Sequence, residues 1–515
     1  MQKQRIYSSL PVHSPDRSRG ILYFLYFAGV AYLLFLLSSQ QNNVFYSGDA
    51  GLKFMAIKQI CASEDFRYIT DTHAQWVKDI WAQGYFPVKE PFVVPSAKGY
   101  LFQYPPAFQF ISSFFYGKFG YKGLYIIPFI SLLLLWYWFI RTALKLSYST
   151  KETAVMFFLL AFCSPLSFYG VVYWEHTLAM LLEFSAIYFV LCKPQQPWLG
   201  AVLGILSGLT AWLRPECMLI NILLAGSLAV IDFRRLTLAH WLFAIGLLVG
   251  TMSFLIFNKV EYGYFFGMHG LQVLGNSGHF NKLKQAGNIF RINLLLIEYF
   301  PVVLLLIPAV FAWLVYKYPL KKTTIALILV CLAYCLFSLY MFPNDGGVGG
   351  KQWGPRFFLP VIPIIILILA DIYAQWKLMV IDIRRRRSFA ILAILTLGSG
   401  FIVNTFIEAR TLRNENSNRV HPALSFVQQD PGNVIVVNAH FVTMELASIF
   451  REKDFFLAED TAKFNKLLPF LKQQGVDHFI YINEAGLPNG FDQVLSAHQI
   501  TLQQIGSYKI GIFSL

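Results

Sequence analysis

Residues 21–53 read ILYFLYFAGVAYLLFLLSSQQNNVFYSGDAGLK, an apolar run followed by a short acidic turn. The apolar part, Ile21 to Ser39, approaches the ~20 residues that a helix needs to cross the hydrocarbon core of a bilayer. Basic residues precede it, as in a signal peptide. The run is nevertheless too long for a signal-peptide core, and no small-x-small cleavage site follows. We therefore predict an uncleaved membrane anchor with its N-terminus in the cytoplasm.

The composition extends this prediction to most of the chain. Of the 515 residues, 56% are hydrophobic and only 14% are charged, and the mean hydropathy is +0.52. At this apolarity the spanning segments must be helices, because a helix satisfies its own backbone hydrogen bonds in lipid. We predict an all-α polytopic membrane protein with about eleven transmembrane helices, at about 21–39, 122–143, 153–171, 178–192, 197–213, 217–232, 238–257, 291–315, 323–342, 357–374 and 388–406.

Basic residues support the order of these spans. They gather in every second short connection, as the positive-inside rule expects of cytoplasmic loops, and the last cluster is Arg384 to Arg387. This arrangement explains most of the net charge of +14, so no nucleic-acid partner is implied. An odd number of spans places the C-terminus outside, and the location expected is the plasma (inner) membrane.

The segment of about 40–121, directly after the first span, is far too long for a simple connection and is expected to carry function. Within it, Trp76, Val77, Ile80 and Trp81 share one side of a predicted amphipathic helix. Such a helix suits the membrane interface, with its tryptophans at the depth of the headgroups. A second helix is predicted from 107 to 119, after a proline pair. It is apolar but short, so it either lies at the membrane surface or spans, and spanning would change the count.

Two later segments are also expected outside the membrane. The first, about 258–290, is rich in glycine and is predicted to be a mobile loop. The second is the tail, in which strand and helix patterns alternate. We predict two domains, a transmembrane domain at 1–406 and a small extracytoplasmic α/β domain at 407–515. The tail elements expected are strands at 433–437, 478–482 and 505–515 and a helix at 461–473.

The acidic turn Ser47-Gly48-Asp49 is the first candidate for chemistry. Aspartate and glycine are common in turns that cap helices, so Asp49 is either the cap of a helix starting near Ala50 or a functional carboxylate. The long aromatic loop after it, and the polar residues expected on the same face, favour the second interpretation. The carboxylate would then act as a general base on an acceptor hydroxyl.

Other polar residues are expected on this outer face. Glu175 and His176 lie at one junction between spans, where they are either catalytic or ordinary solvated loop residues. Arg214 and Arg356 lie at later junctions and would either bind a phosphate or extend toward lipid headgroups. Arginine binds phosphate through two parallel hydrogen bonds and lysine as a point charge. The candidate substrate-binding residues are therefore Lys53, Lys98, Tyr104, Arg214, Lys351 and Arg356.

The chain resembles the GT-C class of membrane glycosyltransferases, in the style of protein O-mannosyltransferases and lipid A aminoarabinose transferases. Members often end in an outer soluble domain and often carry a second acid where Glu175 lies. Their first loop often has two adjacent acids, whereas Ala50 follows Asp49 here, which argues against a two-carboxylate metal site. The resemblance covers most of residues 20–375, and its motifs are Gly48-Asp49-Ala50, Tyr104-Pro105-Pro106, Trp174-Glu175-His176, Arg214-Pro215-Glu216 and Gly354-Pro355-Arg356.

This resemblance implies an inverting transfer of a sugar from a polyprenyl-phosphate donor to a lipid, glycan or protein acceptor on the extracytoplasmic face. Asp49 would be the base, with Glu175 and His176 as further catalytic residues and membrane lipids as partners. The spacing of histidines and cysteines supports no dedicated zinc site, and a divalent cation stays open. Two alternatives remain. A lipid-linked glycan polymerase or ligase usually carries its principal loop late in the chain, and a transporter or flippase would show ionisable residues deep in its spans and inverted repeats.

Overall fold

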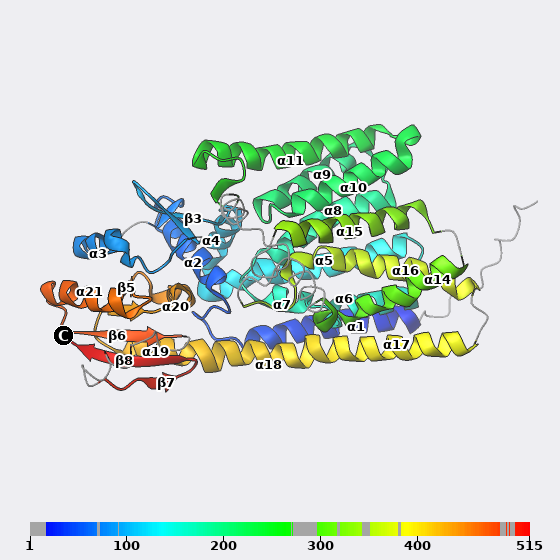
Figure 1. Cartoon of the computed structure of the whole chain (residues 1–515). Helices are drawn as coiled ribbons and strands as arrows, with labels where there is room; N and C mark the ends of the chain where they lie inside the picture. Colours follow the sequence, from blue (N-terminus) through cyan, green and yellow to red (C-terminus); the bar gives the residue numbers. More distant parts are fainter. Residues whose placement is uncertain are drawn as a thin grey trace, which may run out of the picture.

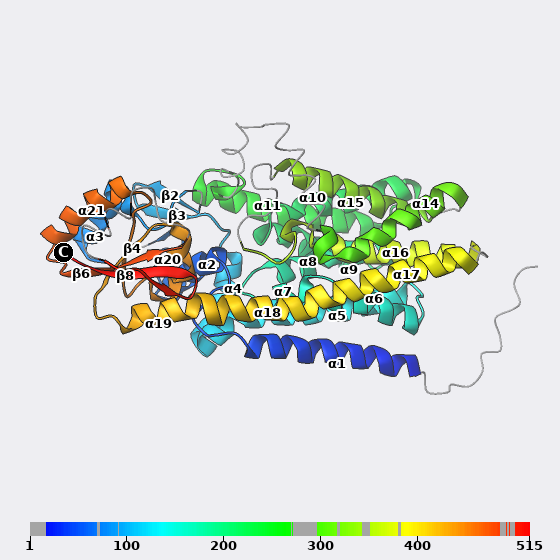
Figure 2. The ribbon, with the colours of Figure 1, turned by 60° about the horizontal axis from the view of Figure 1, so that its bottom comes forward.

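The computed structural model describes residues 17–69, 73–90, 92–268, 270, 296–316, 320–341, 351–379, 383–484, 491, 494 and 500–515. In Figure 1 the described chain is elongated, with long helices side by side at one end and the strands gathered at the other. Figure 2 shows the same division after a rotation about the long axis. The chain thus has a helical bundle and a strand-containing end.

Helices lie at each of the eleven predicted spans. In the described part of the chain, four helical stretches are long and apolar enough to cross a membrane, and six shorter helices are apolar. The chain is therefore a mostly helical, membrane-embedded protein, while the count of about eleven spans stays a prediction. The helices of the bundle are α1 (Arg17–Ser38), α5 (Ile126–Lys145), α6 (Thr150–Phe162), α7 (Leu166–Val171), α8 (His176–Cys192), α9 (Pro197–Leu209), α10 (Cys217–Asp232), α11 (Leu238–Tyr262), α14 (Leu306–Tyr316), α15 (Lys322–Met341), α16 (Val361–Met379) and α17 (Ile383–Phe401).

The long segment after α1 folds at the strand-containing end. It begins with α2 (Gly48–Cys61) and contains a small antiparallel sheet in the order β1-β3-β2. The helix predicted at 107–119 is present as α4 (Ala107–Phe119) and is joined to α5 by a short 3-10 helix. The other elements of the segment are β1 (Tyr68–Ile69), α3 (Gln75–Ile80), a π-helical turn (Trp81–Tyr85), β2 (Val93–Ser96) and β3 (Gly99–Phe102).

The interfacial role predicted for the helix around Trp76 is wrong. Trp81 is only 5% exposed, and its Nε1 donates a hydrogen bond to the carbonyl of Phe455 at 2.8 Å. The ring of Trp76 lies 5.9 Å from the ring of Phe456. The apolar side of α3 therefore packs on strand β5 (Asp454–Leu457) of the C-terminal sheet. This strand takes the place of the lipid that the sequence predicted as the contact surface.

The C-terminal tail is linked to the bundle by one long helical rod, which runs along the lower edge of Figure 1. After α17 the rod continues through a π-helical segment (Ile402–Ile407), α18 (Glu408–Arg413), a second π-helical segment (Asn414–Val420) and α19 (His421–Gln429). The predicted domain boundary at 406–407 thus falls inside continuous helix. Residues 421–515 are called the C-terminal unit below.

A five-stranded sheet in the order β5-β4-β6-β8-β7 forms the core of the C-terminal unit. Strand β4 pairs in parallel with β5 and β6, whereas β8 is antiparallel to β6 and β7. All four residues of β4 are buried, as expected for a central strand covered on both faces. The three strands and the helix predicted from sequence are confirmed as β4 (Val434–Val437), β6 (His478–Asn483), β8 (Tyr508–Ser514) and α21 (Thr461–Gln473); the unit also contains α20 (His440–Glu445) and β7 (Gln503–Ile505).

The glycine-rich segment predicted at 258–290 begins later than expected. Helix α11 continues through Tyr262 and ends at Gly263, whose φ of +79° is the left-handed conformation typical of a glycine after a helix. Most of the remaining segment, including 271–290, lies outside the described residues, as does the glycine-rich stretch 344–350.

Candidate active site

Asp49 occupies the first turn of α2 and does not cap it. The capping position is Ser47, whose backbone is extended (φ −142°, ψ 158°). The Asp49 carboxylate instead accepts a hydrogen bond from Nη1 of Arg356 at 2.6 Å and another from the Tyr104 hydroxyl. Of the two interpretations of the acidic turn, the structure therefore favours a carboxylate committed to side chains over one committed to the helix backbone.

The surroundings of Asp49 keep its carboxyl group ionised. Burial alone would raise its pKa, because the charged form is poorly solvated. The charges of Arg356 and Lys53, with the hydrogen bonds from Arg356 and Tyr104, outweigh burial and hold the pKa of Asp49 below its usual value. Asp49 is thus a paired anion in this structure, and its basicity depends on whether Arg356 stays with it.

A second ion pair lies one turn further along α2. Lys53 follows Asp49 by four residues, so both side chains project from the same face of the helix. The Lys53 ammonium pairs with Glu175, each side chain being only 4% exposed, and its Nζ lies 4.5 Å from the centre of the Tyr104 ring. Glu175 precedes α8 directly and also accepts a hydrogen bond from Nη1 of Arg214 at 3.2 Å.

The charged side chains form a buried series of alternating sign. Arg214 continues the series by pairing with Glu216. Buried charges of this kind are tolerated because each has an opposite neighbour, and removal of one partner leaves a costly orphan. The series runs Arg356, Asp49, Lys53, Glu175, Arg214 and Glu216, with salt bridges between Arg356 and Asp49, Lys53 and Glu175, Glu175 and Arg214, and Arg214 and Glu216.

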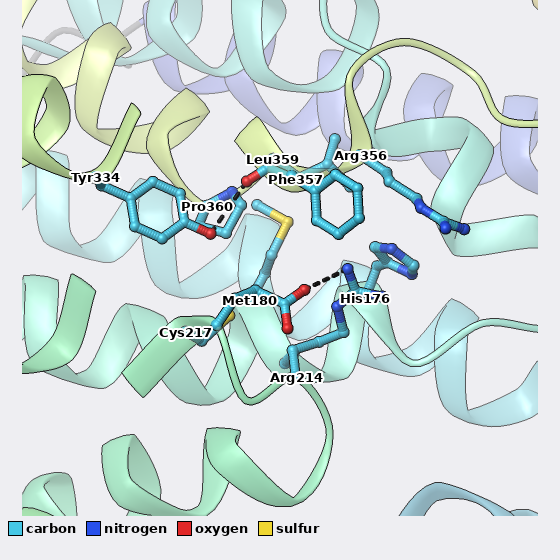
Figure 3. A pocket seen from close by; sticks show the side chains of 11 residues that line it. His176, Met180, Arg214, Cys217, Tyr334, Arg356, Phe357, Leu359 and Pro360 are labelled. Carbon is cyan, nitrogen blue, oxygen red and sulfur yellow. Dashed lines mark hydrogen bonds and ion pairs between the residues drawn. The ribbon is translucent and has the colours of Figure 1, made fainter. Parts of the chain in front are cut away.

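A narrow pocket opens beside this series, and Figure 3 shows its lining. His176, Arg214, Glu216 and Arg356 contribute its polar side, and Glu216 is paired with Arg214. Among the described residues, neither ring nitrogen of the buried His176 has a hydrogen-bond partner. The centre of the Phe357 ring lies 5.3 Å from the guanidinium carbon of Arg214 and 5.2 Å from that of Arg356. The apolar part of the lining includes Met180, Tyr334, Phe357, Leu359 and Pro360.

Seven of the nine predicted site residues meet here, and two do not. Lys98 is exposed in the turn between β2 and β3, where its charge acts on Asp65. Lys351 pairs with Glu445 of the C-terminal unit, and its Nζ also lies 3.4 Å from Glu415. Lys351 is thus held against the C-terminal unit and is not among the residues that line the pocket. The seven that meet are Asp49, Lys53, Tyr104, Glu175, His176, Arg214 and Arg356.

Sequence reasoning missed the contribution of the C-terminal unit. Glu445 is 2% exposed, and besides Lys351 it accepts a hydrogen bond from the Tyr508 hydroxyl. Local sequence contains no signal for this contact, because Glu445 lies 94 residues from Lys351.

The residues present do not favour a divalent cation at this site. In the described part of the chain, no group of three or more histidine, cysteine, aspartate or glutamate side chains could hold a metal ion. Asp49 and Glu175 are each paired with cationic side chains, which would repel a metal. The surroundings of Asp49 therefore do not support a bound divalent cation.

Comparison with known proteins identifies the fold. No protein-family model and no curated protein sequence matches the chain. The crystal structures of ArnT from Cupriavidus metallidurans, bound to undecaprenyl phosphate and in the apo state, match with TM-scores of 0.54 and 0.57 at 11% identity, over 96% of this chain and 98% of ArnT. A weaker match is the Archaeoglobus fulgidus oligosaccharyltransferase tethered with an acceptor peptide (TM-score 0.47, 13% identity, 91% of this chain and 69% of that one).

The similarity to ArnT extends over nearly the whole of both chains. ArnT is a lipid A aminoarabinose transferase of the GT-C class of glycosyltransferases. The chain therefore has a GT-C membrane glycosyltransferase fold, which confirms the resemblance that the sequence motifs indicated. At 11% identity the likeness concerns the fold, so the reaction has to be argued from the site.

Proposed function

We propose that the chain is an integral membrane glycosyltransferase that moves a sugar from a polyprenyl-phosphate donor to an acceptor on the extracytoplasmic face. The observation that carries this proposal is the Asp49–Arg356 pair, placed beside a pocket that a second arginine also lines. This arrangement offers a carboxylate for an acceptor hydroxyl and two guanidinium groups for a phosphate. The fold shared with ArnT supports the choice of a lipid-linked donor.

The pocket suits the phosphate end of such a donor. Arg214 and Arg356 both line it next to the Phe357 ring, as Figure 3 shows. A planar guanidinium matches phosphate oxygens well, and it is weakly hydrated enough to work when buried. Met180 and Leu359 continue the lining with apolar surface, which suits the first isoprene units. His176 offers two unengaged ring nitrogens within the same pocket.

The same geometry couples donor binding to the strength of the base. A donor phosphate that engages Arg356 would weaken its hold on Asp49, and burial would then raise the pKa of that carboxyl. Asp49 would accept the proton of the acceptor hydroxyl as the hydroxyl oxygen bonds to the anomeric carbon. The bond from that carbon to the phosphate oxygen breaks, and the leaving phosphate keeps the electron pair, stabilised by both arginines.

Glu175 receives a different role from the one expected. Its carboxylate is held by Lys53 and Arg214, which leaves it poorly available as a base. We propose that Glu175 positions these two cations, so that Lys53 supports Asp49 and Arg214 faces the pocket. The acceptor class, whether lipid, glycan or protein, is decided by groups outside this charged series.

Donor use is expected to depend on the two arginines. Loss of a charge-assisted contact costs about 1.5–3 kcal/mol, so Arg356→Ala and Arg214→Ala should each raise the donor KM by about ten- to a hundredfold. The measurement is consumption of a radiolabelled polyprenyl-phosphate sugar by purified protein in proteoliposomes. Lys98→Ala, which removes an exposed cation, is the matched control and should leave the KM unchanged. An unaltered KM in both arginine variants would exclude the phosphate role.

The acid limb of the pH–rate profile should report the Asp49–Arg356 contact. kcat/KM falls when acid protonates the base of the free enzyme. Because Arg356 lowers the pKa of Asp49, that limb should lie below the usual range of a carboxyl group. In Arg356→Gln the effect of burial, which raises the pKa, is opposed only by Lys53 and Tyr104. The acid limb should then move to higher pH. An acid limb that stays in place would show that a group other than Asp49 titrates there.

The extracytoplasmic placement can be tested with a native cysteine. Cys61 at the end of α2 is exposed, so a membrane-impermeant maleimide added to intact cells should label it, and Cys61→Ser should abolish the signal. In the Cys61→Ser background, exposed Lys472→Cys in the C-terminal unit should also react from outside. Exposed Gln195→Cys, between α8 and α9, should react only after lysis. The reverse pattern would invert the topology and move the site to the cytoplasm.

A further inference from the structure

The C-terminal unit reaches the candidate site through helix α20 and the 3-10 turn that follows it (Ala447–Ile449). Helix α20 lies beside α2, the helix that carries Asp49 and Lys53, as Figure 1 shows. Met444 and Glu445, the last two residues of α20, make different contacts. Met444 packs on α2, whereas Glu445 binds the loop that leads to Arg356.

The contact between Met444 and α2 is made at backbone distance. A Cβ atom added to Gly51 would lie 1.6 Å from the carbonyl oxygen of Met444 and 3.1 Å from Cβ of Ala447. At Gly48 an added Cβ would lie 3.1 Å from Cβ and Cε of Met444. The two glycines flank Asp49 in sequence, so the position of this part of α2 is set against the C-terminal unit.

The contact made by Glu445 fixes the loop that carries Arg356, the partner of Asp49. Lys351, five residues before Arg356, pairs with the Glu445 carboxylate. Glu445 is itself fixed by the Tyr508 hydroxyl of β8. Further along the same loop, Nε1 of Trp353 donates to Oδ1 of Asn404 in the helical rod at 3.1 Å. The loop that carries Arg356 is therefore tied to elements that also place the C-terminal unit.

We propose that α20 is a positioning element of the active site, in which Met444 sets the place of Asp49 and Glu445, through Lys351, sets the place of Arg356. This inference rests on the proposed function. Asp49 and Arg356 come from separate elements, and small errors in the placement of reacting groups are costly to rate. Lys351 is in this view a tether of the loop and not a phosphate ligand.

Gly51→Ala tests the packing contact. Alanine is intrinsically the better helix former, so this variant can only do harm by pushing α20 away from α2. We expect turnover of labelled donor in proteoliposomes to fall at least about tenfold, with the donor KM little changed. The distance between spin labels on Cys61 and on Lys472→Cys should lengthen in the same variant. The matched control is Gly117→Ala in α4, where no described heavy atom lies within 4 Å of the added Cβ.

Glu445→Gln tests the tether. The amide keeps the size of the side chain but loses the charge that binds Lys351, so Arg356 should hold Asp49 less firmly. We expect the acid limb of kcat/KM to move to higher pH, a change that a loss of stability alone would not produce. Glu459→Gln is the matched control, because it removes another carboxylate of the C-terminal unit, which pairs with Lys89 and Lys463 and not with Lys351. Glu445→Asp should restore much of the wild-type profile.

The outcomes separate the two proposals. Wild-type protein that consumes no polyprenyl-phosphate sugar would overturn the proposed function and the positioning role that rests on it. An active wild type with wild-type turnover in Gly51→Ala and an unmoved acid limb in Glu445→Gln would overturn the positioning role alone. A label distance unchanged by Gly51→Ala would also overturn it, because the contact would then not be the close one on which the inference depends.

Discussion

Asp49→Asn should lower turnover at least about a hundredfold, because a positioned general base contributes roughly 10²–10⁴-fold. The amide keeps the size of the side chain and can still accept a hydrogen bond from Arg356. It cannot take a proton from an acceptor hydroxyl. The measurement is single-turnover transfer of labelled sugar in proteoliposomes, where donor binding and chemistry are resolved separately. Donor binding should survive, because the cationic side chains that we assign to the phosphate are all retained.

A loss of folding has to be separated from this loss of chemistry. Removing the charge of Asp49 leaves the Arg356 guanidinium, which is only 13% exposed, without its anionic partner. The double variant Asp49→Asn with Arg356→Gln removes both charges, so its thermal stability should recover toward the wild type while transfer stays low. Near-wild-type transfer by Asp49→Asn itself would exclude Asp49 as the base and direct the search to His176, whose ring nitrogens have no hydrogen-bond partner among the described residues.

Glu175→Gln should produce the largest loss of stability. Breaking a buried ion pair by removing one partner typically costs about 3–5 kcal/mol, and both Lys53 and Glu175 are buried. Arg214 keeps Glu216 as a partner, so the orphaned charge is that of Lys53. Burial lowers the pKa of Lys53, so the penalty should shrink as the pH rises and the ammonium gives up its proton. Thermal unfolding in detergent across a pH series measures both effects.

A solvent-exposed pair provides the comparison for this variant. Lys89 and Glu459 are 47% and 32% exposed, and pairs of this kind contribute about 0–1 kcal/mol. Glu459→Gln should therefore hardly shift the unfolding temperature. Adding Lys53→Met to Glu175→Gln should recover part of the stability, because it removes the orphaned charge. Equal shifts for Glu175→Gln and Glu459→Gln would show that the inner pair is solvated and that the series of charges is not a buried unit.

Much of the bundle could be predicted from local sequence. Apolar runs of spanning length became helices at each expected place, and strands β4, β6 and β8 and helix α21 lie where their patterns indicated. These features follow from short-range rules, since lipid excludes unpaired backbone groups and a buried strand has to be apolar. Apolar side chains can be buried either in lipid or against protein. For Trp76 of α3 and Trp81 of the following turn the sequence predicted the membrane interface, whereas in the structure both pack on β5.

The residues of the site were largely visible in the sequence, but their partners were not. Polar side chains at the outer ends of apolar runs indicated Asp49, Glu175, Arg214 and Arg356. In the sequence analysis Lys351 was treated as equivalent to the other cations, because nothing local distinguishes a cation that lines the pocket from one that is held against the C-terminal unit. Glu445, the carboxylate that pairs with Lys351, lies in a part of the chain where the sequence indicated no site residue.

By itself the sequence determined a helical membrane protein with an acidic turn after its first span. The length of an apolar run and its lack of charged residues can both be read from about twenty consecutive residues. Only the tertiary structure decided that Asp49 faces Arg356, 307 residues away, and that Lys53 faces Glu175. It also decided that α20 closes on α2 at Gly51. The physical reason is that a buried charge is stable only beside its opposite, and which opposite is within reach is set by how helices distant in sequence pack together.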